Sequence, residues 1–294
     1  MLRIQTILVP IDFSDRSEPA IEHACNIAKQ FGALPVFLHV VPEGPYPPAF
    51  VGAFPDIARW EISEESGESL RTELDRRVAQ LAAGTAREVV VESGDPAEVI
   101  AQTAKKRNAD LVVMPTAGTG IFRRLVLGST TTKVLNDVDA PIMTGTHVEE
   151  IRAFAIQPYA QIGCAVSGDE SSGRTLAWAQ GFADRYHSGP LTVIHAAPIP
   201  AIAIGSGPAR HVDLVAAAKQ SARKKVNALL AQAGIEAHTT VEVGWPSGVV
   251  PTVARKAKLD LLIIGRHSAE DIFSGLQSDT YGIVREAPCP VVSV

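Results

Sequence analysis

The sequence predicts two α/β domains in tandem, each built on a doubly wound, parallel, five-stranded sheet. Short apolar runs alternate with stretches whose apolar residues recur at helical spacing. This succession is typical of a parallel sheet that helices cover on both faces. The same succession occurs twice along the 294 residues, and that length is sufficient for two domains that each bury a core.

The duplication is visible in the residues themselves. VESGDPAEVIAQTAKKRNADLVVMP, which begins at Val91, returns as VEVGWPSGVVPTVARKAKLDLLIIG from Val241. FLHVVP at 37–42 returns as VIHAAP at 193–198. A repeat of this length is too long for a solenoid and matches a whole domain. We therefore expect three parts of the chain, in order: a domain at 1–147, a linker at 148–158 and a second domain at 159–294.

In the first half, five apolar runs predict strands, and four stretches with helical spacing predict the helices between them. The expected strands are 6–10, 35–41, 87–92, 111–114 and 140–144. The expected helices lie in SEPAIEHACNIAKQFG, ESGESLRTELDRRVAQLAAG, DPAEVIAQTAKKRNA and STTTKVLNDV. The third helix carries its own start signal, because Asp95 is a capping residue, Pro96 suits the first helical position and Glu98 completes a capping box. We expect the strand order 3-2-1-4-5 of flavodoxin-like and Rossmann-like sheets.

Sheets of this kind bind ligands beyond the carboxyl ends of their strands, where the winding reverses. Two stretches of the first half follow such ends, PIDFS at 10–14 and PTAGTG at 115–120, and Gly-Ser-Thr at 128–130 opens the last helix. Glycines let backbone N–H groups approach an anion, and a helix N-terminus attracts negative charge. These residues predict a phosphate-binding crevice in the first half.

Composition argues against several other classes of protein. A net charge of −5 argues against a nucleic-acid-binding protein, which normally has a basic face. No apolar run reaches the roughly 18 residues of a membrane span, and the N-terminus has the pattern of a first strand rather than of a signal peptide. The three cysteines and eight histidines lack disulfide or metal-ligand spacing, so we expect buried cysteines, a reducing cytoplasm and no metal enzyme.

The chain resembles the universal stress protein family. ILVPIDFSDRSEPAIEHA is similar to the family's opening strand, acidic turn and first helix, and GDPAEVI…ADLVVM to its third helix and fourth strand. AGTGIFRRLVLGSTTTKVLNDVDAPIM resembles its phosphate loop, last helix and last strand. ATP-binding members carry glycine, two residues, glycine, nine residues, glycine, and then serine or threonine. Gly118, Gly128 and Ser129 fit this pattern, whereas Pro115 replaces its first glycine.

The resemblance implies an ATP site in the first half. It implies backbone and hydroxyl contacts to the phosphates from Gly118, Gly120, Gly128, Ser129 and Thr130. It also implies that the ribose and a Mg²⁺ ion lie near Asp12, and that the adenine lies near Pro10, Ile11, Val40 and Met114. Pro115 belongs to the same expected site, where it removes one N–H donor and fixes φ.

The second half departs from this pattern. Gly265 keeps the first glycine, but other positions change: Ser167 for Asp12, Ser268 for the next glycine, and Gln277 or Ser278 for Gly128. Three acids add negative charge where phosphates would lie, namely Glu270, Asp271 and Asp279. Like-charge repulsion disfavours an anion there, so we expect no ATP binding in the second half.

Several of these features also have a purely structural explanation. Asp12 is equally explained as a cap for the helix that follows it, and Arg123 and Arg124 as a solvated basic edge. His39 and His195 recur through the duplication alone. We expect the three tryptophans to be packing residues: Trp60, Trp178 and Trp245. The proline-rich stretch 42–56 is either a mobile loop or a lid over the crevice.

We therefore expect a cytoplasmic stress-response protein that binds ATP, or a related adenine nucleotide, and acts as a nucleotide-linked sensor or regulator. The residues arrange no nucleophile, base and orienter, so the protein is not expected to be an enzyme, beyond slow ATP hydrolysis helped by Asp12 and a metal ion. One alternative is a nucleotide-independent interaction or scaffold protein whose site Pro115 inactivates. A lesser alternative is an adenylate-transferring enzyme, but PIDFSD is not the Ser-Gly-Gly loop that such an enzyme needs.

The resemblance also implies how the chain assembles. Family members commonly dimerise through the last strand, and both halves end in an apolar strand. We expect 141–144 to pair with 290–294 as an intramolecular pseudo-dimer, because an unpaired apolar edge would invite association. A further homodimer of two chains stays open at this point, and neither nucleic acid nor membrane is expected as a partner.

Overall fold

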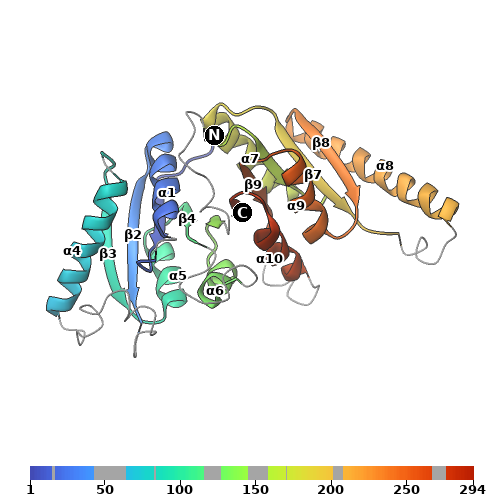
Figure 1. Ribbon diagram of the computed structural model, residues 1–294. Coiled ribbons are helices and arrows are strands. Elements are labelled where there is room, and N and C mark those ends of the chain that lie inside the picture. Colours follow the sequence, from blue (N-terminus) through green and yellow to red (C-terminus); the bar gives the residue numbers. More distant parts are fainter. Residues whose placement is uncertain are drawn as a thin grey trace. The chain divides into compact units, whose positions relative to one another are not determined.

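The computed structural model of the chain describes residues 1–14, 17–42, 64–82, 84–115, 127–144, 158–169, 171–200, 208–266 and 276–294. The chain divides into two compact units. One comprises Arg3–Thr144, and the other comprises Gly145–Val294 together with Met1–Leu2. Strands and helices alternate within each unit (Figure 1). The linker expected at 148–158 and the proline-rich stretch 42–56 lie, apart from residues 42 and 158, outside the described residues.

In the first unit, the described elements follow one another in the expected order. They are β1 (Thr6–Pro10), α1 (Ser17–Phe31), β2 (Leu34–Val41), α4 (Glu64–Leu81), β3 (Glu88–Ser93), α5 (Pro96–Lys106), β4 (Leu111–Val113), α6 (Ser129–Asp137) and β5 (Ile142–Thr144). The clearest difference is that β5 begins at Ile142 rather than at residue 140. The carbonyl of Pro141 still accepts a hydrogen bond from the Val112 N–H at 2.8 Å, but proline has no N–H to add to a strand.

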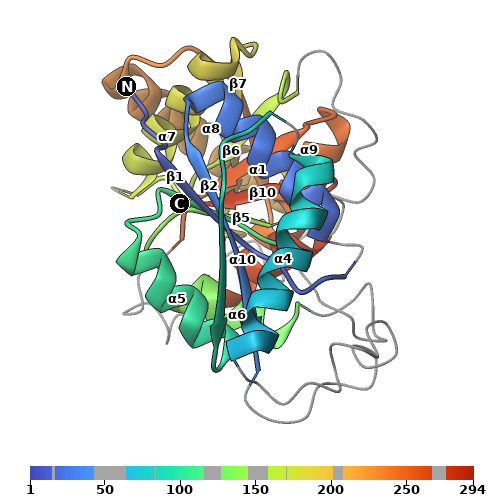
Figure 2. The same ribbon diagram turned by 90° about the vertical axis from the view of Figure 1, so that its left-hand side faces the viewer.

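The sheet of the first unit confirms the expected topology. Its strands lie in the order β3-β2-β1-β4-β5, and the pairs within it are parallel. Helices α1 and α4 pack together over one face of this sheet, and α5 and α6 pack together over the other (Figure 2). Central strand β1 is covered on both sides, so Ile7, Leu8 and Val9 are fully buried. This double burial is the physical reason that β1 is apolar without alternation.

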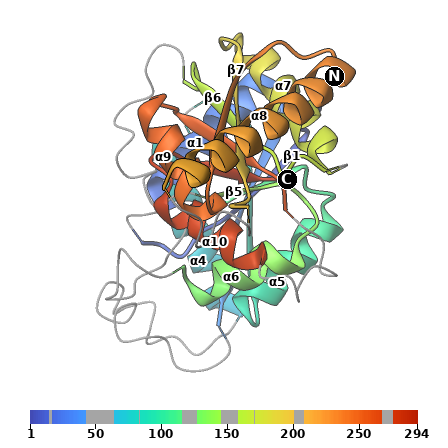
Figure 3. The ribbon, with the colours of Figure 1, turned by 90° about the vertical axis from the view of Figure 1, so that its right-hand side faces the viewer.

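The second unit repeats this arrangement. Its elements are β6 (Ile162–Ala165), α7 (Ser172–Tyr186), β7 (Leu191–Ala197), α8 (Pro208–Ala233), β8 (Ala237–Val243), α9 (Pro246–Lys256), β9 (Leu261–Ile264), α10 (Leu276–Glu286) and β10 (Val291–Ser293). The order β8-β7-β6-β9-β10 is again built from parallel pairs. Helix α7 packs with α8, and α9 packs with α10 (Figure 3). Two doubly wound α/β domains therefore follow one another along the chain, as the sequence predicts.

The cap expected at α5 is present. The Asp95 carboxylate accepts hydrogen bonds from the N–H groups of Ala97 at 3.0 Å and Glu98 at 3.1 Å, and Pro96 occupies the first turn. These bonds hold the pKa of Asp95 below its usual value. Within the described residues, the Glu98 carboxylate makes no hydrogen bond back to the Asp95 N–H. The helix start is therefore set by Asp95, without the reciprocal half of a capping box.

The cysteines behave as small buried apolar side chains, as expected. Cys25, Cys164 and Cys289 are all buried and form no disulfide. Burial raises the pKa of the Cys25 thiol to about 11, and that of the other two thiols to about 12. Because the thiolate is the reactive form, these groups are inert near neutral pH.

The described residues contain no cluster of three His, Cys, Asp or Glu side chains able to hold a metal ion. Among the described helices, none combines the length and the apolar character that crossing a membrane requires.

Candidate functional site

The candidate site lies beyond the carboxyl ends of β1 and β4. These strands are parallel neighbours, with Ile7 opposite Leu111 and Leu8 opposite Val112. The two stretches that follow them, 10–14 and 114–115, therefore start from the same edge of the sheet. This edge is the place where doubly wound sheets bind their ligands.

Apolar residues form the base of this edge. Ile11, Val40 and Met114 are each less than a tenth exposed. The Ile11 N–H donates to the Leu38 carbonyl at 2.8 Å, and the Met114 N–H donates to the Met143 carbonyl at 3.0 Å. The backbone thus stays in register with the neighbouring strands one residue past β1 and β4. The expected adenine contacts are therefore held by the sheet itself.

Asp12 organises the turn between β1 and α1. Its Oδ1 atom accepts hydrogen bonds from the Ser14 N–H at 3.0 Å, the Ser14 hydroxyl at 2.6 Å and the Ser17 hydroxyl at 2.8 Å. The Asp12 N–H in turn donates to the Ser17 Oγ at 3.3 Å. Asp12 therefore closes the turn before α1, whereas no described bond joins it to a backbone N–H of α1, so the cap stays a prediction. Its Oδ2 atom has no hydrogen bond within the described part of the chain, so one carboxylate oxygen is available to a ligand.

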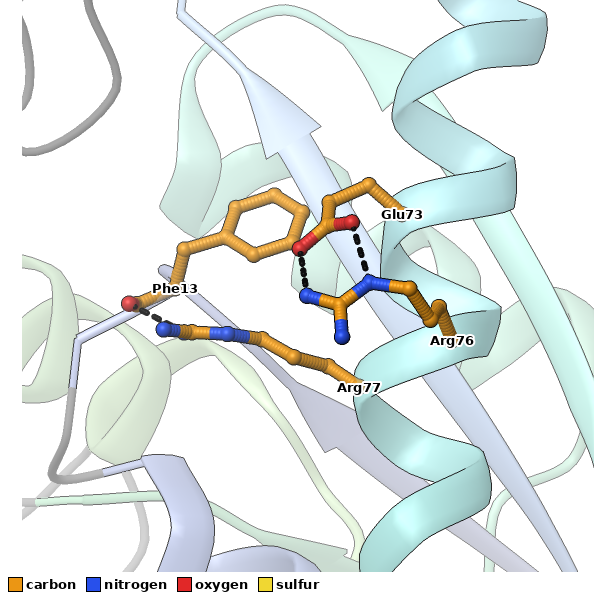
Figure 4. Close-up of polar contacts among 4 residues, drawn as sticks. All are labelled: Phe13, Glu73, Arg76 and Arg77. Atoms are coloured by element: carbon orange, nitrogen blue, oxygen red, sulfur yellow. Dashed lines mark hydrogen bonds and ion pairs between the residues drawn. The ribbon is translucent and has the colours of Figure 1, made fainter.

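The next residue, Phe13, has a left-handed backbone conformation, with φ +59°. For a residue other than glycine this conformation costs about 1–2 kcal/mol. Contacts on both sides of Phe13 offset this cost. Its ring lies against the His39 ring, with centroids 4.4 Å apart. The Arg77 Nη1 donates to its carbonyl oxygen at 2.5 Å (Figure 4). The Arg77 guanidinium carbon also lies 5.9 Å from the Phe13 ring centroid.

Sequence reasoning missed the pair formed by Phe13 and Arg77. The two residues are 64 positions apart, and no motif links them. Arg77 also resembles its neighbour Arg76, which instead forms an exposed ion pair with Glu73 on the same helix (Figure 4). Only the packing of α4 against α1 and β3 decides which arginine reaches the turn.

His39 ties β2 to the turn after β1. Its Nδ1 atom lies 2.8 Å from the Ile11 carbonyl oxygen. Because a carbonyl can only accept, Nδ1 carries the proton. Burial lowers the pKa of His39, although the hydrogen bond to Ile11 opposes this shift. In the second domain, His195 makes the same contact, with Nδ1 2.9 Å from the Val166 carbonyl, so the duplicated histidines share a structural role.

The start of α6 is the second part of the site. Gly128 is the cap residue and makes no side-chain cap hydrogen bond, and the first turn contains no acid. Pro115 is connected to this turn, because the Thr131 hydroxyl donates to the Pro115 carbonyl at 3.3 Å. Ser129 is exposed. Within the described residues, the first N–H groups of α6 therefore have no side-chain acceptor, which is the condition for an anion site.

Part of the expected site falls outside the described residues. This applies to Gly118 and Gly120 of the expected phosphate loop, and to the basic residues Arg123 and Arg124. The described structure brings together the residues at the ends of β1 and β4, and joins Pro115 to α6.

The second domain differs at each corresponding position. Ser167, in place of Asp12, lies with its Oγ 3.2 Å from the Ser172 Oγ, and the Gly168 N–H donates to Ser172 at 3.0 Å. Asp279 lies in the first turn of α10 and accepts a hydrogen bond from the Ser247 N–H of α9 at 3.3 Å. A carboxylate thus occupies the helix start that is uncharged in α6.

Trp245 corrects one of the expectations. Trp178 is buried and stacks on Phe182 at 5.2 Å, which confirms it as a packing residue, whereas Trp60 lies outside the described residues. Trp245 is 73% exposed, so the expectation that it packs in the interior was wrong. Trp245 occupies the cap position of α9, where the first domain has Asp95. A cap residue lies before the first turn of its helix and so does not belong to the face that the helix buries.

Comparison with known proteins identifies the family. The model of the universal stress protein family matches residues 3–144 and, a second time, residues 158–294. The chain belongs to the universal stress protein family. Its two family domains are in tandem, and their order along the chain agrees with the duplication seen in the sequence.

Individual relatives and solved structures agree. A universal stress protein of Methanocaldococcus jannaschii is 34% identical over 139 residues, which cover 47% of this chain and 79% of that protein. One from Thermus aquaticus is 33% identical over 142 residues, covering 47% of this chain and 96% of the relative. A crystal structure of a universal stress protein from Archaeoglobus fulgidus matches 99% of this chain and 96% of its own, with a TM-score of 0.68 at 18% identity. At that identity the structural match shows the tandem fold alone.

Proposed function

We propose that the first domain binds ATP or a related adenine nucleotide, and that the protein acts as a nucleotide-linked regulator in a cytoplasmic stress response. Membership of the universal stress protein family supports the wider role. The observation that carries the nucleotide proposal is the uncapped, acid-free start of α6 at Gly128. It lies next to the strand ends where this fold binds ligands.

The charge at the start of α6 favours a phosphate group. The unpaired N–H groups and the helix dipole together place partial positive charge there, which stabilises an anion. Gly128 has φ −60°, a conformation that any residue adopts, so its backbone does not require glycine. What glycine provides is the absence of a side chain over the amides. Ser129, exposed beside them, would add a hydroxyl contact.

The rest of the nucleotide fits the other residues. The apolar edge at Ile11, Val40 and Met114 suits a flat base. Asp12 has one carboxylate oxygen available for a ribose hydroxyl or for a Mg²⁺ ion. The described residues contain no cluster of three metal ligands, so such an ion would be held by Asp12 and the phosphates, as Mg²⁺ commonly is.

Pro115 changes the phosphate site without removing its main element. Proline donates no N–H, so this position provides only its carbonyl, which accepts the hydrogen bond from Thr131. The donors that remain are the amides of α6 itself. We therefore propose that binding persists with fewer loop contacts. We also propose binding without designed turnover, and sustained release of many product molecules per chain would contradict this.

Thermal unfolding with and without ATP and Mg²⁺ tests the proposal. At about 100 times its dissociation constant, a ligand stabilises the folded state by about 2.7 kcal/mol. We expect a clear rise in melting temperature for the wild type, and none for Gly128→Glu, whose carboxylate would lie at the start of α6. The control is Gly67→Glu, which adds the same charge on α4, where the glycine has open space around it. This control should keep the rise.

The alternative is a nucleotide-independent interaction protein. Two observations favour it: the missing N–H of Pro115 and the exposed indole of Trp245. Under this alternative, ATP at saturating concentration leaves the melting temperature of the wild type unchanged. That result would exclude the nucleotide proposal and make Trp245 the first residue to mutate in a search for protein partners.

A further inference from the structure

The second domain contains a pocket of about 110 Å³ at the carboxyl ends of β6 and β9. It lies where the first domain has its candidate nucleotide site. Its apolar wall includes Ala165, Val166, Pro246, Val250, Ile264 and Ile283. A cavity of roughly 150 Å³ holds benzene, so this pocket has room for a ligand of similar or slightly smaller size.

The polar groups of the pocket are hydroxyls and one carboxylate. The hydroxyls belong to Ser167, Ser171, Ser172, Thr175 and Thr280, and the carboxylate belongs to Asp279. Ser172 and Thr175 are nearly fully buried. Among the described residues that line the pocket there is no lysine, arginine or histidine. Its chemistry is therefore that of an acceptor-rich site with negative charge, opposite to a phosphate site.

The space for the hydroxyl of Thr175 depends on the absence of a side chain at Gly265. A Cβ atom at Gly265 would lie 3.0 Å from the Thr175 Oγ1, closer than most real contacts. The repeat places Ala20 and Pro115 at the equivalent positions of the first domain. The first domain thus combines the small Ala20 with the larger Pro115, whereas the second combines the larger Thr175 with Gly265. Only the second combination brings a hydroxyl to the strand end.

Asp279 is placed to receive a donor. Its Oδ1 accepts from the Ser247 N–H at 3.3 Å, which is a long bond, and within the described residues its Oδ2 accepts none. The carboxylate lies at the starts of both α9 and α10, whose dipoles stabilise its charge. An incoming phosphate would meet this charge at close range, whereas an ammonium group would gain a charge-assisted hydrogen bond.

We propose that this pocket binds a small hydroxylated amine, with its ammonium group on Asp279 and its hydroxyl groups on the serine and threonine side chains. The apolar wall then covers the carbon skeleton. The two domains of one chain would thus bind ligands of opposite charge at equivalent places.

Three probes of nearly equal size test the charge preference: serinol, which is an ammonium at neutral pH, uncharged glycerol and anionic glycerate. Each is titrated at millimolar concentration into the full-length protein, and the backbone amide signals of Ser247, Asp279 and Thr280 are followed by NMR. We expect saturable shifts with serinol, at least tenfold weaker binding of glycerol, and no binding of glycerate. Equal binding of serinol and glycerol, or no saturable shift with serinol, would overturn the proposal.

Two variants locate the charge that matters. Asp279→Asn keeps the side-chain shape and an acceptor for Ser247, and we expect it to bind serinol at least tenfold more weakly, at the level of glycerol. Asp184→Asn is the matched control, since Asp184 lies on α7 and accepts from Gln180 outside the residues that line the pocket. Unchanged serinol binding by Asp279→Asn would contradict the assignment. ATP binding by the first domain is independent of either result.

Discussion

The turn that follows the first strand of each domain has the same role in both, but different residues build it. In the first domain the left-handed position is Phe13, with φ +59°, and in the second it is Gly168, with φ +85°. The ring of Phe13 lies against His39, whereas a Cβ atom at Gly168 would already come within 3.2 Å of the Cε1 of His195. In the first domain a side chain, the ring of Phe13, therefore packs against the histidine. In the second domain the backbone at Gly168 takes that place.

The comparison shows how duplicated domains diverge without a change of fold. The turn before α1 has a strained residue whose cost is offset by an aromatic contact and by Arg77. The turn before α7 has no such strain and no such contacts to offset it. The two domains also differ in the side chains and the charge at their strand ends. The second domain has hydroxyl groups and the carboxylate of Asp279 around its pocket. Four predictions test this comparison, from the largest expected effect to the smallest.

Replacing Phe13 should have the largest effect. Phe13→Ala removes a ring that is 1% exposed but leaves a Cβ atom in the left-handed conformation, so we expect a loss of about 3–5 kcal/mol in the free energy of unfolding. Phe13→Gly loses the same ring but relieves the backbone, and should be more stable than the alanine variant by about 1 kcal/mol. Urea denaturation measures both. An alanine variant more stable than the glycine variant would show that the turn is not strained.

Acid should destabilise the first domain through His23. This residue is 2% exposed on α1, and the repeat places Trp178 at its position in the second domain. Burial lowers the pKa of His23 from 6.5 to about 4. Between these two pKa values, His23 is protonated in the unfolded chain but neutral in the folded domain. The free energy of unfolding therefore falls as the pH drops from about 6.5 toward about 4.

Between about pH 6.5 and pH 5 this single group should cost about 2 kcal/mol. The lowered pKa of His39 acts in the same direction. Hydrogen exchange of the amides of α1 at the two pH values measures the loss, and His23→Leu should remove the part due to His23. A leucine variant with the same dependence on pH would assign the effect to other groups.

Gly168→Ala tests the second domain in the reverse sense. The left-handed conformation and the approach to His195 together predict a loss of about 1–2 kcal/mol. Gly173→Ala is the control, because Gly173 lies in α7 with open space around it, and alanine there should stabilise the helix slightly. Thermal unfolding of both variants gives the comparison, and equal melting temperatures would mean that the glycine at 168 is not required.

The smallest effect is expected for Arg77→Met, beside its neighbour Arg76. Arg77 donates to the Phe13 carbonyl and lies near its ring, so its loss should cost about 1 kcal/mol. Arg76→Met breaks only an exposed ion pair with Glu73 and should leave the urea midpoint unchanged. If both variants behave alike, Arg77 does not support the turn.

The amino-acid sequence by itself determined the duplication, the alternation of strands and helices, the parallel character of each sheet, the Asp95 cap and the burial of the cysteines. These features follow from spacing and local chemistry, which are properties of short segments. Only the tertiary structure decided that Arg77 rather than Arg76 reaches Phe13, that Asp279 meets Ser247, that Trp245 is exposed and that hydroxyls line a pocket in the second domain. Each of these depends on residues distant in sequence, or on which surface the packing leaves uncovered, and local periodicity contains no information about either.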